Sequence, residues 1–175
     1  MKIPRIAWAA YGFALIVIVL DQLTKAWVLG SADLSDAALI PDGYRFAEVV
    51  PGIFSITMVR NTGVSFGLFG GGEARWVLSL FAVLVAGALA WWALQAQRRT
   101  LNAAIGLVIG GAVGNAIDRI RFGYVVDFID FSGTGLFPWV FNVADSAITI
   151  GVALLILDSI RSERKPAVGV AHEKA

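Results

Sequence analysis

Four long runs of apolar residues dominate the chain, and they occupy about residues 6–29, 76–94, 101–119 and 137–158. Few polar residues interrupt them: the first run contains DQLTK at 21–25, and the fourth contains Asn142 and Asp145. About 20 mainly apolar residues are enough for a helix to cross the hydrocarbon core of a bilayer. The pattern therefore predicts a mainly α-helical membrane protein with four transmembrane helices.

A different pattern lies between the first two runs. Phe54, Ile56 and Met58 alternate with hydroxyl residues, which is the two-residue period of a β-strand. Asn61 and Gly63 then mark a turn. We expect a small antiparallel sheet at about residues 40–70, on the outer side of the membrane between helices one and two, where its aromatic residues suit the headgroup zone.

Positive charges predict how the helices are oriented. Lys2 and Arg5 precede the first run, and Arg98 and Arg99 separate the second run from the third. Because cytoplasmic segments carry an excess of Lys and Arg, we expect both termini in the cytoplasm. A basic start before an apolar core is also typical of a cleaved signal peptide, but no A-x-A-like site follows it and the run continues through Asp21, which favours an uncleaved helix.

The C-terminal tail and the number of domains can also be predicted. The charged segment 162–175 is predicted to be a disordered cytoplasmic tail. No internal repeat is visible, so we expect one integral-membrane domain over residues 1–175.

Composition supports the membrane assignment and excludes several kinds of chemistry. The chain is 58% hydrophobic and 15% charged, whereas a soluble domain has about a quarter of its residues charged. A net charge of +1 gives no basic surface for nucleic acid. There is no cysteine, and the one histidine is His172 in the tail, so Cys–His, Ser–His and H-E-x-x-H sites are excluded. We expect neither a metal nor an organic cofactor.

The remaining chemistry lies in polar residues near the predicted outer ends of the helices. They are Asp21, Lys25, Asn61, Asn115, Asp118, Arg119, Asp127, Asp130, Asn142 and Asp145. Two neighbouring carboxyl groups share a proton, so one acts as a base towards water while the other acts as an acid towards a carbonyl. Asp127 and Asp145, each flanked by apolar residues, are the best candidates. The alternative is that the acids neutralise Arg119, Arg121 and Lys25, with Asp21 and Lys25 paired one helical turn apart.

The third run carries two stripes of small residues. Gly106, Gly110 and Gly114 recur every fourth residue, and Gly111 lies on the adjacent stripe with Asn115. Small residues at this spacing let helix backbones approach closely, so we expect this helix to pack tightly against its neighbours.

Five short motifs, taken together and in order, resemble those of the bacterial lipoprotein signal peptidases, also called signal peptidase II. They are DQLTK at 21–25, RNTGVSFG at 60–67, GGAVGNAIDR at 110–119, GYVVDFID at 123–130 and FNVADS at 141–146. Each motif is weak by itself, but five in this order over about residues 6–160 are specific.

The resemblance implies an aspartic endopeptidase of the bacterial inner membrane, active near the periplasmic face. It would remove the signal peptide from diacylglyceryl-modified prolipoproteins by cutting before the lipidated cysteine. Asp127 and Asp145 would be the catalytic pair. The supporting residues would be Asn61, Asn115, Arg119, Asn142, Asp21, Lys25 and Gly111. The resemblance also implies membrane lipids as neighbours, globomycin-type cyclic peptides as inhibitors and a protein that works as a monomer.

Two other classes of function remain open from the residues alone. A proton or ion transporter would use Asp21, Asp118, Asp127 and Asp145 as a relay. Transporters, however, typically have repeated halves and polar groups near the membrane midplane, and the sequence shows neither. A structural membrane subunit would not need the aspartates.

Overall fold

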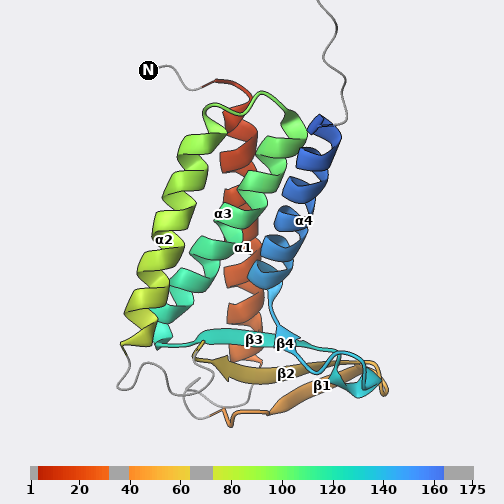
Figure 1. Ribbon diagram of the computed structural model, residues 1–175. Helices are drawn as coiled ribbons and strands as arrows, with labels where there is room; N and C mark the ends of the chain where they lie inside the picture. The colour runs from red at the N-terminus through yellow and green to blue at the C-terminus, as the bar shows by residue number, and fades with distance from the viewer. Residues whose placement is uncertain (1–3, 32–39, 64–72, 164–175) are drawn as a thin grey trace, which may run out of the picture.

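Four long helices form a bundle in the computed structural model, which describes residues 4–31, 40–63 and 73–163 (Figure 1). They are α1 (Ala7–Gly30), α2 (Ala74–Ala93), α3 (Arg99–Phe122) and α4 (Val143–Glu163). All four are long and apolar enough to cross a membrane, which confirms the four predicted transmembrane helices. The fourth was predicted to begin at about residue 137, but residues 140–141 form a strand and the helix begins at Val143. Residues 64–70 of the predicted β segment and 164–175 of the predicted tail lie outside the described residues.

Helix α3 is the centre of the bundle, packed against the other three helices. Of its most apolar stretch 72% is buried, against 28% or less in α1, α2 and α4. Its glycines explain this, because a Cβ at Gly106 would overlap the carbonyl oxygen of Ala10 on α1, and one at Gly111 would overlap that of Ala144 on α4. The close packing expected from the small-residue stripes is therefore present.

A four-stranded antiparallel sheet lies across one end of the bundle, in the order β1-β2-β3-β4 (Figure 1). Its strands are β1 (Arg45–Val50), β2 (Phe54–Asn61), β3 (Val125–Asp130) and β4 (Val140–Phe141). The first two come from the segment between α1 and α2, as predicted. The other two come from the connection between α3 and α4, so placing the whole sheet between helices one and two was wrong.

Strand β3 lacks the alternation that reveals a half-exposed strand. Five of the six residues in VVDFID are buried, because the strand is covered on both faces. On the bundle side, Val126 and Phe128 pack with Val28 of α1 and Met58 of β2. This small core fixes β3 against the end of the bundle and so sets the position of Asp127.

The predicted turn after β2 is also present. The side chain of Asn61 accepts a hydrogen bond from the backbone N–H of Gly63 at 2.8 Å. Gly63 has a φ of 72°, in the left-handed region that favours glycine. The turn leaves the amide nitrogen of Asn61 free to face β3.

Candidate active site

Asp127 is a buried carboxyl group in the middle of β3, with its side chain 1% exposed. One oxygen accepts a hydrogen bond from Asn142 Nδ2 at 2.7 Å, and the other accepts one from Asn61 Nδ2 at 2.9 Å. Burial, and then the neighbouring charge of Asp145, raise the pKa of Asp127 to about 7, although the two amide hydrogen bonds act in the opposite direction. Asp127 therefore keeps its proton to a higher pH than an ordinary aspartate does.

Asp145 is fixed at the start of α4 by a reciprocal pair of hydrogen bonds with Asn142. The residue before the helix, Asn142, accepts a bond from the N–H of Asp145 at 2.9 Å, and the carboxylate of Asp145 accepts one from the N–H of Asn142 at 3.3 Å. This is a capping box, formed by the N-cap residue and the third residue of the helix. The sequence N-V-A-D thus encodes locally both the start of the helix and the position of the carboxylate.

Two buried asparagines connect the two carboxyl groups. Asn142 donates to Asp127 and, at 3.1 Å, to the side-chain oxygen of Asn115. Asn115, on α3, donates to Asp145 at 2.7 Å. The fold therefore brings together five of the polar residues singled out in the sequence, from β2, β3, α3 and α4.

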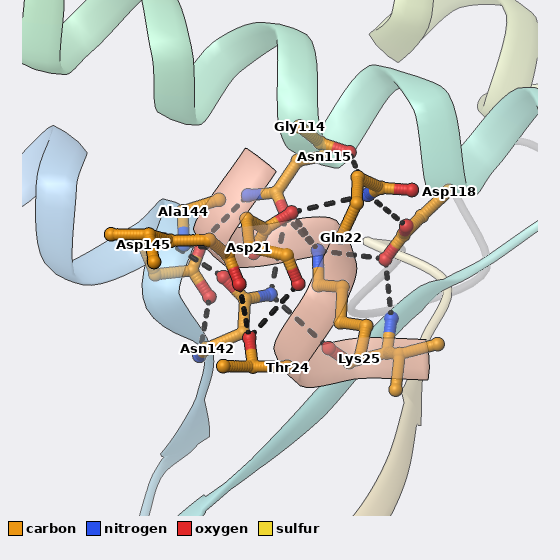
Figure 2. Close-up of polar contacts among 12 residues, drawn as sticks. Asp21, Gln22, Thr24, Lys25, Gly114, Asn115, Asp118, Asn142, Ala144 and Asp145 are labelled. Atoms are coloured by element: carbon orange, nitrogen blue, oxygen red, sulfur yellow. Dashed lines mark hydrogen bonds and ion pairs between the residues drawn. The ribbon is translucent and has the colours of Figure 1, made fainter. Parts of the chain in front are cut away.

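A second group of buried charges lies on the α1 side of these residues (Figure 2). Lys25 Nζ lies 2.8 Å from a carboxylate oxygen of Asp21 and 2.8 Å from one of Asp118. It also donates to Asn115 at 3.2 Å, and all three charged side chains are 2% exposed or less. The predicted ion pair between Asp21 and Lys25 is therefore present. Lys25 forms a second ion pair with Asp118 on α3.

Asp21 also reaches the start of α4. Its second oxygen accepts a hydrogen bond from the backbone N–H of Ala144 at 3.0 Å (Figure 2). Ala144 lies in the first helical turn, where backbone N–H groups have no partner within the helix. Asp21 therefore anchors the turn that carries Asp145.

Gln22 belongs to this second group, and the sequence analysis missed it. Its amide nitrogen donates to Asp118 at 2.9 Å, to the carbonyl oxygen of Gly114 at 3.3 Å and to Asp21 at 3.2 Å (Figure 2). The signal was its position next to Asp21, as an amide within an apolar helix.

The alternative that the acids neutralise basic side chains holds for Asp118, which pairs with Lys25, whereas no salt bridge involves Asp130 within the described residues. The ion-pair partner of Asp118 is Lys25, and Asp118 also accepts a hydrogen bond from the N–H of Val126 at 3.0 Å. Asp130 accepts from Thr57 Oγ1 at 2.7 Å and from the N–H of Ser132 at 2.8 Å. Burial by itself would raise the pKa of Asp130, but these hydrogen bonds outweigh burial and hold the pKa below its usual value.

Arg119, on α3, lies near Asp145. It borders a hollow of about 360 Å³ between α2, α3 and α4, together with Asn115 and Asp145. Its buried Nε has no hydrogen-bond partner within the described residues. A buried donor without a partner costs free energy, so a small movement that brings an acceptor to this atom would be favourable.

Hollows reach the carboxyl groups from other directions as well. Asp127 lines one of about 500 Å³ beside Asn61 and Trp139. Asp145 lines one of about 260 Å³ beside Phe137 and Phe141. In residues 4–31, 40–63 and 73–163, no group of three or more His, Cys, Asp or Glu side chains is placed to hold a metal ion.

Comparison with known sequences identifies the relatives of this chain. Residues 13–161 match the family described as signal peptidase (SPase) II. The chain is 48% identical over 165 residues to a lipoprotein signal peptidase of Caulobacter vibrioides, and the match covers 93% of each sequence. It is 45% identical to one of Shewanella loihica, with 89% of this chain and 88% of the relative covered.

Solved structures with the same fold include two described as bacterial membrane enzymes determined by the in meso method. One has a TM-score of 0.74 and 30% identity and covers 91% of this chain and 92% of its own. The other has a TM-score of 0.72 and 32% identity, and the match covers 87% of this chain and 92% of that structure's chain. On the match over residues 13–161 and these identities, the chain belongs to the signal peptidase II family of membrane peptidases.

Proposed function

We propose that this protein is an aspartic endopeptidase that removes signal peptides from diacylglyceryl-modified prolipoproteins, cutting before the lipidated cysteine. One observation carries the proposal: Asp127 and Asp145 are joined through Asn142, and burial and the charge of Asp145 raise the pKa of Asp127 to about 7. Such a pair holds one proton between two carboxyl groups near neutral pH, which is the state that peptide hydrolysis by an aspartic pair requires.

The proton is assigned to Asp127 before the reaction. Asp145, as a carboxylate, takes a proton from water as the water oxygen attacks the scissile carbonyl carbon. Asp127 gives its proton to the carbonyl oxygen, so that a neutral gem-diol forms. Asp145 then passes its proton to the leaving nitrogen as the C–N bond breaks, and Asp127 recovers a proton from the diol.

The neighbouring polar residues hold this pair and meet the substrate. Asn115 and Asn142 orient the carboxyl groups through the hydrogen bonds described above. Arg119 donates its free Nε–H to a substrate carbonyl, and Asn61 borders the hollow in which the peptide chain lies. Asp21, Lys25 and Gly111 act indirectly, by fixing the first turn of α4 against α1 and α3.

The location of the pair suits a substrate that is part lipid. Asp127 lies on the sheet across the end of the bundle, and Asp145 lies in the first turn of a membrane-spanning helix. A peptide bond at this depth is reached while acyl chains stay in the bilayer. We propose that the site lies at the periplasmic face of the inner membrane, with both termini cytoplasmic, and that the protein acts as a monomer and binds globomycin-type cyclic peptides.

The test is cleavage of a purified diacylglyceryl-modified prolipoprotein by the wild type, Asp127→Asn and Asp145→Asn. Each variant should lose turnover by at least about 10⁴-fold, since aspartate removal from hydrolase sites has effects of this order. Asp42→Asn is the control, because Asp42 is exposed and its hydrogen bond from the N–H of Arg60 is kept by asparagine. Near-normal cleavage by either test variant, folded as shown by its unfolding temperature, would remove that residue from the catalytic pair.

A further inference from the structure

The starts of α1 and α3 lie at the end of the bundle opposite the sheet (Figure 1). Residues from these two starts line a further hollow. Its volume is about 670 Å³. It is remote from Asp127 and Asp145 and has no part in the reaction described above. Its walls combine two kinds of side chain, one apolar and one cationic.

The apolar wall is a continuous strip along α1. Ile6, which directly precedes α1, is followed at intervals of three and four residues by Ala9 and Phe13 on that helix, and Ala103 of α3 lines the same space. A strip of this kind in the membrane-spanning part of a helix suits an acyl chain.

The cationic wall is formed by Arg5, just before α1, and Arg99, the first residue of α3. Both side chains are exposed. Within the described part of the chain neither forms an ion pair, whereas the adjacent Arg98 lies 2.8 Å from Asp158. Asp158 also accepts a hydrogen bond from Thr100 at 3.2 Å, so its carboxylate is already engaged.

An excess of positive charge at this end is expected from membrane orientation alone. That rule does not require two arginines from different helices to border one hollow. Arg161, near the end of α4, satisfies the rule and does not line the hollow. The planar donor fork of arginine matches phosphate oxygens, and basic sites between helices at this membrane boundary bind anionic headgroups.

We propose that this hollow binds one anionic phospholipid, with its phosphate between Arg5 and Arg99 and an acyl chain along Ile6, Ala9 and Phe13. Under the orientation proposed above, the lipid belongs to the cytoplasmic leaflet. A zwitterionic phospholipid carries an ammonium group that the two guanidinium groups repel, so the site discriminates by net headgroup charge.

The experiment is a titration of the purified full-length protein with phosphatidylglycerol, followed by native mass spectrometry. Phosphatidylethanolamine is titrated in parallel. The wild type should retain one phosphatidylglycerol and bind it more tightly than phosphatidylethanolamine. Arg5→Gln and Arg99→Gln should each weaken the binding about fivefold, because one arginine near a headgroup contributes about that factor.

Arg161→Gln is the matched control, since it removes the same charge at the same end of the bundle outside the hollow. It should change the affinity less than about twofold. Ala103→Phe, which fills the hollow and keeps both arginines, should abolish retention of the lipid. Unfolding temperatures of all variants establish that each is folded.

Three results would overturn the proposal: equal affinity for the two lipids, an effect of Arg161→Gln as large as that of Arg5→Gln, or displacement of the lipid by glycerol phosphate alone. The last would identify a site for small phosphates. Because binding is measured without a substrate, these outcomes are separate from the success or failure of the proposed peptidase activity.

Discussion

Replacing Gly111 by alanine tests whether the close approach of α3 to α4 positions Asp145. The added Cβ would overlap the carbonyl oxygen of Ala144 and lie 2.6 Å from Cγ1 of Ile148. Ordinary contacts between carbon atoms are about 3.5–4.0 Å, so the start of α4 must move away by roughly 1 Å. The backbone carbonyl cannot turn aside as the end of a flexible side chain would, and Ala144 directly precedes Asp145.

Two magnitudes follow from this displacement. Overpacking of a tight interface costs about 1–3 kcal/mol, so the free energy of unfolding should fall by that amount. A displacement of about 1 Å in a catalytic group lowers the rate on the order of 100-fold. We therefore expect Gly111→Ala to lower kcat about 100-fold while leaving KM near its wild-type value, because the hollows that hold the substrate remain.

The assay is steady-state cleavage of a fluorogenic lipidated prolipoprotein peptide in one fixed lipid mixture. Gly87→Ala is the matched control, because Gly87 lies within α2 and a Cβ there would meet nothing within 4 Å. It should keep kcat and gain up to about 1 kcal/mol of stability, as alanine favours the helix. If Gly111→Ala cleaves as fast as Gly87→Ala, the packing of α3 against α4 does not position Asp145.

Further predictions concern the proton and the buried charges. Because the pKa of Asp127 is raised to about 7, its protonated form is present below that pH and is lost above it, so kcat should fall about tenfold per unit as pH rises beyond 7. A kcat profile that stays level through this range contradicts the assignment of the proton to Asp127. Asn61→Ala removes a hydrogen bond that lowers this pKa, so the alkaline limb of the same profile should move to higher pH, and an unmoved limb would show that Asn61 does not tune the pair. Lys25→Met leaves two buried carboxylates without their cation and should cost about 3–5 kcal/mol, measured by unfolding in detergent. Arg98→Met breaks a more exposed ion pair with Asp158 and should cost less than about 1 kcal/mol, so equal losses would refute this ranking.

The helices were predictable because their signals are local. A run of about 20 apolar residues has one low-energy form in a bilayer, where every backbone group must find a partner within its own segment. The glycine stripe through Gly106 and Gly110 predicted a closely packed helix for the same reason, since spacing within one helix determines which residues share a face. The start of α4 is equally local, because Asn142 and Asp145 cap it across a single turn.

The sheet was only partly predictable. In the first half of β2, buried and half-buried side chains alternate. The apolar and hydroxyl residues of its sequence show the same two-residue period. Strand β3 is buried almost throughout, and its short apolar run does not distinguish a strand from a connection. Pairing with β2, far away in the chain, is what makes it a strand.

The sequence by itself determined that this protein has four membrane-spanning helices and that acids and amides lie near one end of them. It also determined that each of these groups needs a partner, because an unpaired polar group in an apolar surrounding is costly. Only the tertiary structure decided which partner each one has. Asn61 reaches Asp127 across 66 residues of chain, and Asp21 reaches Ala144 across 123. Such pairings depend on how α3 brings the other elements together, and no local pattern encodes them.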